Sequence, residues 1–384
     1  MNHVALIIPG LDRIGGAERQ VILLAKGLQR RGWRVSVVAL SGTGGDVAAE
    51  LIAAGAGFLT LQMRKGLADP RGWICFHRWL RRESPDVVHA HLPHAAWLAR
   101  WSRLAAPVRV VVDTLHSCST GSLGRRLGYR WSGWLVDRVT AVSRAAAAAY
   151  LSARMATAGK LVVLPNGVDV EAWRPDASVQ IAMRRELGLD EEFLWLAAGR
   201  LDPVKDYPTL LAAMASVPEP ARLLIAGSGP LKDALFRLSS QLGLEQRVRF
   251  LGFEPDLMRW MRAADGFVLS SRCEGLPMGL LEAAACALPT VATEGPGSPE
   301  VVVHGETGWL MPVGDCTALA ESMSKMMRTP PEERRAMGER ARELVIERFS
   351  LETILDRWEA LYGDLLQRNP RPARWGRCGI EPAE

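Results

Sequence analysis

Short apolar runs alternate with longer amphipathic stretches along most of this chain. In the first half, six runs predict strands: Val4–Ile8, Arg34–Leu40, Gly57–Leu61, Asp86–His89, Val108–Asp113 and Arg138–Ala141. The stretches between them, such as Ala17–Arg31 and Ala95–Arg103, have helical periodicity. Because the runs lack strict alternation, they are typical of strands covered on both faces, as in a parallel sheet.

The same alternation starts again in the second half of the chain. It predicts five further strands: Phe193–Ala198, Arg222–Ala226, Val248–Phe250, Gly266–Leu269 and Thr290–Thr293. The turn-forming segment Pro165-Asn166-Gly167 lies between the two series and places a domain boundary near residue 170. We therefore expect an α/β protein of two doubly wound domains, residues 1–170 and 171–350, with ligands bound in a central cleft at their strand ends.

The C-terminal part of the chain differs from both series. Leu351–Leu366 has the pattern of a long amphipathic helix, and we expect residues 351–368 to pack back on the first domain. Residues 369–384 contain three prolines and no periodicity, so we expect a flexible tail there.

The net charge of +5 hides a difference between the two halves. Residues 1–180 carry 23 basic and 12 acidic side chains, whereas the remainder carries 24 basic and 30 acidic ones. The overall basicity is too mild for a nucleic-acid-binding protein, and we expect no nucleic-acid partner. An anionic surface or substrate is expected to bind the first half.

The six cysteines are scattered without a Cys-x-x-Cys pair, so neither a disulfide framework nor a zinc module is expected. Val4–Ile8 predicts a first strand rather than a signal peptide, because no basic leader precedes it and Asp12 and Arg13 follow closely. No run approaches the ~20 apolar residues that span a bilayer. We expect a cytoplasmic protein that is soluble or rests on a membrane surface.

Three loops contain residues suited to binding an anion. The first is PGLDRIGGAER at residues 9–19, where Gly15 and Gly16 precede a helix that begins near Ala17. Free N–H groups at a helix N-terminus favour an anion, and glycines allow close backbone approach. The loop has neither a Gly-x-Gly-x-x-Gly nor a Gly-Lys-Ser/Thr pattern, and a simple tight turn remains the alternative.

The second loop is GRLDPVKD at residues 199–206, directly after a predicted strand. Arg200 supplies a planar fork and Lys205 a point charge, which together could hold a diphosphate. Two solvated surface cations are the alternative.

The third loop is EGLPMGLLE at residues 274–282. Gly275, Pro277 and Gly279 suit a tight entry into a helix, and Glu274 and Glu282 could accept hydrogen bonds from sugar hydroxyls. A loop acid and an ordinary helix-surface acid are the alternative. Glu282 lies among leucines and alanines, however, and burying an acid without a partner is costly, which favours a functional role.

Together with LPNGVD, IAGSGP and VRFLGF, these segments resemble the nucleotide-sugar glycosyltransferases of family 4, also called group 1. The resemblance runs from GGAERQ at residues 15–20 to about residue 368. It implies the GT-B fold, in which two Rossmann-like domains enclose a cleft.

The resemblance also implies roles for individual residues. Arg200 and Lys205 match the diphosphate clamp, Glu282 the acid that holds the ribose hydroxyls, and Glu274 the acid that contacts the donor sugar. The backbone that meets sugar hydroxyls and phosphate would be that of Gly275, Leu276, Pro277, Met278, Gly279 and Leu280. Phe253 matches the position where the backbone meets the base, Gly15 and Gly16 match the loop that closes over the donor phosphate, and His116 matches a histidine near the reacting centre.

The implied reaction is retaining transfer, in which the acceptor hydroxyl attacks from the face that the diphosphate leaves. Catalysis then depends on stabilising charge on that diphosphate, and His116, Glu274, Arg200 and Lys205 are the residues expected to carry it. The chain contains no Asp-x-Asp, so we expect no metal ion and no cofactor beyond the nucleotide sugar. A UDP-sugar is expected by family frequency, with a GDP-sugar as the alternative. His89, His91 and His94 lack the carboxylates or thiolates that would complete a zinc set.

Basic and apolar residues mix in three stretches of the first half, at residues 26–34, 77–82 and 125–135. Such mixtures suit binding to an anionic membrane surface. The alternative is an ordinary amphipathic helix, whose apolar side packs on the core and whose basic side faces solvent. We expect His91, His116, Arg125 and Arg126 on the acceptor side, and a peripheral enzyme on the inner face of the bacterial cell membrane that extends a lipid-linked glycan for a surface polysaccharide. There are three alternatives. The enzyme could use a soluble acceptor, such as a sugar phosphate, an inositol phosphate or a thiol precursor. The protein could instead be a nucleotide-sugar 2-epimerase or a non-catalytic scaffold.

Overall fold

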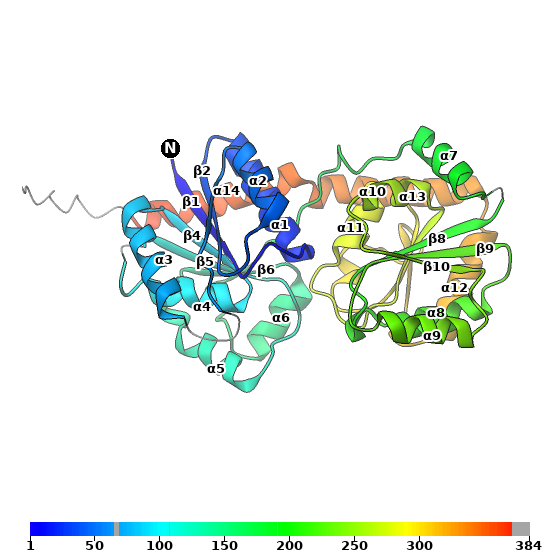
Figure 1. Cartoon of the computed structure of the whole chain (residues 1–384), viewed down its shortest axis with the longest axis horizontal. Helices are drawn as coiled ribbons and strands as arrows, with labels where there is room; N and C mark the ends of the chain where they lie inside the picture. The colour runs from blue at the N-terminus through cyan, green and yellow to red at the C-terminus, as the bar shows by residue number, and fades with distance from the viewer. Residues whose placement is uncertain (65–68, 107, 190, 371–384) are drawn as a thin grey trace, which may run out of the picture.

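Two parallel sheets, each covered by helices on both faces, make up the two domains of the molecule (Figure 1). The computed structural model describes residues 1–64, 69–106, 108–189 and 191–370. The predicted α/β class, with two doubly wound sheets, is confirmed. Of the expected tail, only Asn369 and Pro370 are described, and residues 371–384 lie outside the described residues.

The sheet of the first domain has seven strands in the order β3-β2-β1-β4-β5-β6-β7, and every neighbouring pair is parallel. Its strands are β1 (His3–Ile8), β2 (Arg34–Ala39), β3 (Gly57–Thr60), β4 (Val87–His91), β5 (Val110–Leu115), β6 (Arg138–Ala141) and β7 (Leu161–Val163). One face packs on α1 (Gly16–Arg30) and α2 (Gly45–Ala53). The other packs on α3 (Pro70–Glu83), α4 (Pro93–Ser102), α5 (Leu123–Trp131) and α6 (Arg144–Ser152), with the short 3-10 helix η1 (Gly133–Leu135) after α5.

The sheet of the second domain has six strands in the order β10-β9-β8-β11-β12-β13, again all parallel. Its strands are β8 (Phe193–Ala198), β9 (Ala221–Ala226), β10 (Val248–Gly252), β11 (Gly266–Leu269), β12 (Thr290–Thr293) and β13 (Gly308–Met311). The helices are α7 (Ala177–Glu186), α8 (Tyr207–Ser216), α9 (Lys232–Gln241), α10 (Leu257–Ala263), α11 (Met278–Ala285), α12 (Cys316–Arg328) and α13 (Pro331–Phe349), with 3-10 turns η2 (Pro203–Lys205) and η3 (Ser298–Glu300).

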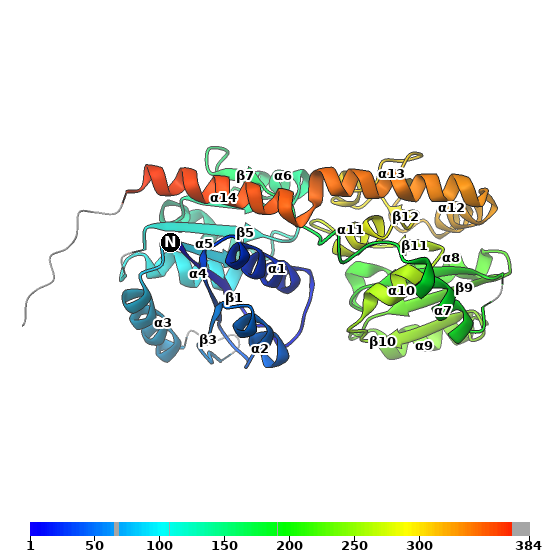
Figure 2. The ribbon, with the colours of Figure 1, turned by 90° about the horizontal axis from the view of Figure 1, so that it is seen from above.

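The last helix, α14 (Leu351–Arg368), returns to the first domain. Figure 2 shows α13 along the second domain and α14, in red, continuing along the first. The apolar side of α14, which includes Leu355, Trp358 and Tyr362, is buried in the same core as β1 and α1. Close packing sets the identity of Gly27 on α1, because a Cβ there would lie 2.5 Å from a methyl carbon of Leu355.

Several strand bounds differ from those predicted. The prediction of Val108–Asp113 is wrong in its bounds, because β5 is Val110–Leu115 and His116 is the first residue after it. Strand β4 extends to His91 rather than His89, and ends where Leu92 adopts a φ of 71° before the proline that begins α4. Strands β7 and β13, of three and four residues, were not predicted.

The two domains meet through the loops that follow their strands. Residues after β1, β5 and β6 contact residues after β11 and β12, so the carboxyl ends of both sheets face each other. The region between these ends is called the cleft. This is where doubly wound sheets bind their ligands. Among the described residues no helix is long and apolar enough to cross a membrane.

Candidate active site

The start of α1 lies against the start of α11 across the cleft. Gly15 is the N-cap of α1, and its N–H donates to the Glu18 carboxylate at 3.0 Å. A Cβ on Gly16 would lie 3.2 Å from Cγ of Met278, the first residue of α11. Two helix N-termini therefore point their positive ends into the same part of the cleft, which favours an anionic ligand such as a diphosphate.

Glu282, on α11, has an ion-pair partner from the other domain. The Arg19 Nη1 atom on α1 lies 2.5 Å from Oε1 of Glu282, whose side chain is only 4% exposed. Burial raises the pKa of the Glu282 carboxyl, and the Arg19 guanidinium acts in the opposite direction. Arg19 is not among the residues predicted for the site. The signal that could have found it is Glu282 itself, since a buried carboxylate requires a cation nearby.

Lys205 and Glu274 form a second pair, within the second domain. The Lys205 Nζ atom lies 2.5 Å from Oε1 of Glu274, and both side chains are about one-fifth exposed. Gly199 allows this placement, because it has a φ of +151° and a Cβ there would lie 2.8 Å from Cε of Lys205. Lys205 and Glu274, both predicted for the donor site, thus lie together in the structure.

Two other predicted donor residues are largely exposed. The Arg200 side chain is 68% exposed, and its Nε lies 3.7 Å from Oδ2 of Asp202. Phe253 follows β10 and is 64% exposed. The structure thus brings Lys205, Glu274 and Glu282 close together, and it leaves the side chains of Arg200 and Phe253 largely exposed.

The loop from Glu274 to Leu280 presents its backbone to the cleft. The side chains of Leu276 and Leu280 are buried in the core of the second domain, and Pro277 is the N-cap of α11. Gly279 packs beneath the sheet, where a Cβ would lie 3.0 Å from the Phe267 ring. The side chains of Leu276 and Leu280 therefore point inward, whereas the Met278 side chain faces Gly16 and Gln20 of α1.

The same loop contacts the segment that contains His116. The Cys118 thiol donates to the Glu274 carbonyl at 3.1 Å. A Cβ on Gly275 would lie 2.3 Å from the His116 carbonyl oxygen, so only glycine fits this contact between the domains. His116 of the first domain and Glu274 of the second therefore lie on segments that contact each other.

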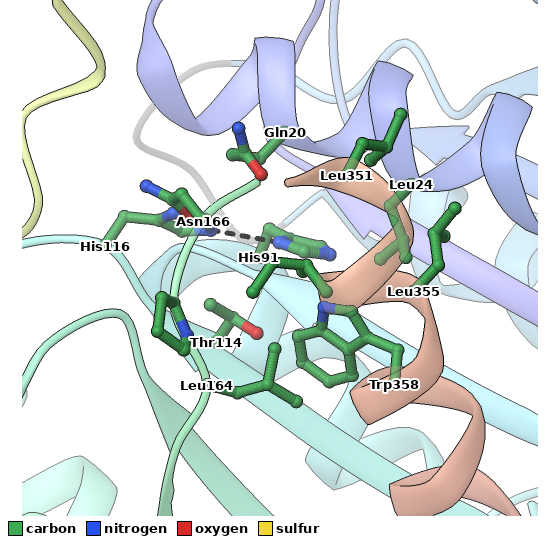
Figure 3. A pocket seen from close by; sticks show the side chains of 12 residues that line it. Gln20, Leu24, His91, Thr114, His116, Leu164, Asn166, Leu351, Leu355 and Trp358 are labelled. Carbon is green, nitrogen blue, oxygen red and sulfur yellow. Dashed lines mark hydrogen bonds between the residues drawn. The ribbon is translucent and has the colours of Figure 1, made fainter. Parts of the chain in front are cut away.

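His116, which is half-buried, lies next to two buried histidines, His89 and His91, at the ends of β4 and β5. Its Nε2 is hydrogen-bonded to Nδ1 of His91 at 3.0 Å, as the dashed line in Figure 3 shows. His89, the next histidine along β4, is hydrogen-bonded through its two ring nitrogens to Thr114 and Tyr362, both at 2.6 Å. The ring therefore joins β5 to α14.

Burial keeps these histidines neutral. It lowers the pKa of His116 to about 4, and it lowers the pKa values of His89 and His91 well below the usual range. A small cavity of about 20 Å³ adjoins His91 and His116, between α1, the 164–166 segment and α14 (Figure 3). Neutral imidazoles can donate or accept a hydrogen bond, so His116 suits contact with a sugar hydroxyl.

His94 is exposed, whereas His89 and His91, the other two histidines considered for a zinc site, are buried. Among the described residues no group of three or more His, Cys, Asp or Glu side chains is arranged to hold a metal ion. Arg125 and Arg126 lie at the start of α5, separated from His116 by residues 117–122, and both are half-buried.

Gln20 joins both domains to the segment between them. Its amide donates to the Gly167 carbonyl at 2.7 Å and accepts from the Gly167 N–H at 2.9 Å, while its Nε2 lies 3.2 Å from the Met278 sulfur. The structure has no turn at Pro165-Asn166-Gly167, where one was predicted, and Gln20 holds this extended segment against α1 beside Met278.

Two doubly wound domains that direct two helix N-termini, a lysine and two carboxylates into one cleft define a GT-B glycosyltransferase. The family model "Glycosyltransferase Family 4" matches residues 14–172, and the model "Glycosyl transferases group 1" matches residues 179–344. The chain belongs to this family of glycosyltransferases.

Known proteins similar to this chain include enzymes with different acceptors. The N-acetyl-alpha-D-glucosaminyl L-malate synthase of Bacillus anthracis is 32% identical over 303 residues, which cover 75% of this chain and 77% of the relative. The UDP-Gal:alpha-D-GlcNAc-diphosphoundecaprenol alpha-1,3-galactosyltransferase of Escherichia coli is 24% identical, over 78% of this chain and 81% of the relative. The structure of Anabaena Alr3699/HepE in complex with UDP and glucose has a TM-score of 0.82 at 24% identity, covering 94% of this chain and 99% of that one. The expected GT-B fold is thus confirmed.

Proposed function

We propose that this enzyme is a retaining, metal-independent glycosyltransferase that moves a hexose or N-acetylhexosamine from a nucleotide diphosphate sugar to a hydroxyl of a lipid-linked glycan. The observation that carries the proposal is the meeting of Lys205, Glu274 and Glu282 beside the N-termini of α1 and α11. A UDP-sugar is the proposed donor, supported by the UDP bound to the Anabaena relative and by the UDP-galactose named for the Escherichia coli one.

The donor lies in the cleft with its diphosphate at the two helix N-termini and Lys205. The ribose hydroxyls bind Glu282, and the sugar hydroxyls bind Glu274, the backbone of residues 275–280 and the neutral His116 ring. Arg200, on an exposed loop, turns inward to the diphosphate when the donor binds. Charge stabilisation by fixed dipoles and cations of this kind accelerates departure of an anionic group.

In the chemical step, the bond between the anomeric carbon and the diphosphate oxygen breaks as the bond to the acceptor oxygen forms on the same face. The acceptor hydroxyl proton passes to the departing diphosphate oxygen, so no separate base is required. The low pKa of His116 agrees with a hydrogen-bonding rather than a proton-accepting role.

The acceptor is proposed to be a lipid-linked glycan used in bacterial surface polysaccharide synthesis, with the enzyme peripheral on the inner face of the cell membrane. Support comes from the diphosphoundecaprenol acceptor named for the Escherichia coli relative. The basic excess of the first domain, which carries the acceptor side, favours an anionic partner. A soluble acceptor is the second candidate, because the Bacillus anthracis relative is named for transfer to L-malate.

The test is product analysis with purified enzyme, a panel of UDP- and GDP-sugars, and both lipid-linked and soluble acceptors. The α configuration of the new linkage, read from the anomeric coupling in NMR spectra, distinguishes retention from inversion for an α-linked donor. Release of an epimerised nucleotide sugar without transfer would contradict the proposal. Glu282→Ala is expected to abolish transfer while the fold survives, and Glu321→Ala, on α12 of the same domain, is the control.

Metal independence is tested with the same assay. Addition of EDTA to enzyme freed of divalent ions is expected to change the transfer rate less than about twofold, because Lys205 and the helix N-termini supply the positive charge. A loss of activity that Mg²⁺ or Mn²⁺ restores would contradict this part of the proposal.

A further inference from the structure

Two helices on the outer face of the first domain expose apolar ridges to solvent. On α4 and just beyond it, Trp97, Trp101 and Leu104 repeat at helical spacing. On α5 and η1, the exposed apolar residues are Leu123, Leu127, Trp131 and Trp134. Trp131 is 75% exposed and Trp134 65%. These seven residues are called the α4–α5 surface below.

The two ridges form one surface. The Trp97 ring lies over Gly128 of α5, where a Cβ would approach Trp97 Cζ2 to 2.0 Å. Figure 1 shows α4 and α5 next to each other on the side of the first domain away from α14. Contiguous exposed apolar area of this kind, rich in tryptophan, marks an interaction site rather than ordinary surface.

The segment that carries the α4–α5 surface has exposed charges of one sign. Residues 93–136 contain a single acidic side chain, Asp113, which is fully buried and accepts from Arg100 at 2.6 Å. Arg125, Arg126 and Arg130 lie on α5 itself, and within the described parts of the chain no carboxylate forms an ion pair with them. The surface therefore combines apolar ridges with uncompensated positive charge.

The other basic stretches do not have this combination. Arg31, at the end of α1, is held by Glu352, Asp356 and Glu359 of α14. Lys26 is paired with Glu50, and Arg34 with Glu83. Among the described residues of the three stretches that mix basic and apolar side chains, only residues 125–135 combine arginines without an ion pair and exposed tryptophans, because Trp33 and Trp79 of the other two stretches are buried.

We propose that the α4–α5 surface docks the enzyme on an anionic lipid bilayer. This inference rests on the proposed function, since a lipid-linked acceptor requires the cleft to approach a membrane. Tryptophan and leucine side chains insert at the headgroup boundary, while arginines bind anionic headgroups. A second copy of this chain fits less well, because a two-fold contact would bring the arginines of both copies together.

The position of the surface suits access to the acceptor site. Residues 117–122 alone separate His116 from Leu123, the first residue of the exposed α5 ridge. Docking through α4 and α5 therefore sets the His116 side of the cleft close to the plane from which a lipid-linked hydroxyl would enter.

The test is co-sedimentation of the full chain with vesicles at low salt. The vesicles are made of equal parts phosphatidylglycerol and phosphatidylcholine, or of phosphatidylcholine alone. We expect binding to the anionic vesicles, a loss of at least about tenfold in partitioning for the double variant Trp131→Ser/Trp134→Ser, and about fivefold for Arg130→Gln. Ile181→Ser, an exposed apolar residue on α7, and Arg30→Gln, an exposed arginine on α1, are matched controls that should bind as the wild type does.

Failure of wild-type binding, or equal binding by the double variant, would overturn the proposal. The proposal would also be overturned if the enzyme does not bind vesicles and light scattering shows that the wild type is a dimer and the double variant a monomer. Stabilisation by UDP and transfer to a soluble acceptor are measured without vesicles, and the double variant should retain both. Vesicle binding without any UDP stabilisation or transfer would leave docking supported and reject the proposed function instead.

Discussion

Arg19 of the first domain and Glu282 of the second are joined by an ion pair of 2.5 Å across the cleft. Glu282 is also the residue proposed to bind the ribose hydroxyls of the donor. The guanidinium and the donor therefore compete for one buried carboxylate, and donor binding is expected to release Arg19 from it. A cation set free at the N-terminus of α1 is then close to where the diphosphate is proposed to lie.

The first prediction concerns Arg19→Ala. Without the guanidinium, the buried Glu282 carboxylate loses its partner, and we expect the free enzyme to lose about 1–3 kcal/mol of unfolding free energy. Ribose hydroxyls replace part of that interaction, so UDP should raise the melting temperature of the variant more than that of the wild type. Thermal shift with and without UDP measures both effects, and Arg30→Ala, at the far end of the same helix, is the control. UDP stabilisation as small as in Glu282→Ala would show that Arg19 holds the donor directly.

The second prediction concerns Lys205→Met. The variant keeps the aliphatic stem beside Gly199 but removes the charge next to Glu274, so we expect the domain to remain folded. Loss of a cation that stabilises the departing diphosphate should lower kcat about 10²–10³-fold. Steady-state kinetics and a thermal melt test it, with Lys232→Met, on exposed α9, as the control. A kcat within a factor of about three of wild type would remove Lys205 from the reaction.

The sequence predicts the periodic elements of this fold well and the contacts between its domains poorly. Strands such as Phe193–Ala198 are buried on both faces, so their apolar runs are visible without a structure. The partner of Glu282 is 263 residues away, and no local pattern indicates it. The same holds for Tyr362, which reaches from α14 to His89. Glycines 199 and 275 are explained only by the side chain and backbone that approach them from elsewhere.

The third prediction concerns stability in acid. His116 has a pKa of about 4 in the folded state, against about 6.5 when it is exposed by unfolding. Its contribution is therefore complete above about pH 6.5 and is lost as the pH falls toward about 4, because the unfolded chain binds the proton more readily. This histidine alone should cost about 2 kcal/mol between about pH 7 and about pH 5. His89 and His91 act in the same direction.

Urea unfolding of the wild type and of His116→Asn at about pH 7 and about pH 5 measures the contribution of His116 to the loss of unfolding free energy. The variant should lose less stability on acidification than the wild type does. The raised pKa of Glu282 acts in the opposite direction in both proteins, so the difference between them is the relevant quantity. His94→Asn changes an exposed histidine and serves as the control. Equal pH dependence of wild type and His116→Asn would show that His116 is not a buried neutral group.

The fourth prediction concerns the attachment of α14. Arg31 donates to Asp356 at 2.6 Å, to Glu359 at 2.7 Å and to Glu352 at 2.5 Å, and its side chain is mostly buried. Arg31→Met should lower the unfolding free energy by about 1–2 kcal/mol, and by less at high salt, because screening already weakens the pairs in the wild type. Arg30→Met, whose side chain is exposed and lies 3.6 Å from Glu352, should have little effect. An Arg31→Met melt unchanged at low salt would mean that the network contributes no stability.

The fifth prediction concerns the contact between Gly275 and His116. A methyl group on residue 275 would lie 2.3 Å from the His116 carbonyl oxygen, and neither backbone can move without shifting the other. Gly275→Ala should therefore separate the loop of residues 274–280 from the backbone at His116 by a fraction of an ångström to one ångström. Misplacement of that size costs about 10²-fold in rate. UDP stabilisation should persist, since Glu282 and Lys205 stay in place.

Gly363→Ala is the matched control, because Gly363 lies within α14 and a Cβ there meets no atom within 4 Å. That substitution should leave transfer unchanged and raise stability by about 0.5–1 kcal/mol through helix propensity. Transfer kinetics and UDP thermal shifts are measured for both variants, and they distinguish a loss of transfer rate from a loss of UDP binding. Full transfer activity in Gly275→Ala would mean that the domains move apart during turnover, so that the close contact at His116 is not the one in which the sugar is transferred.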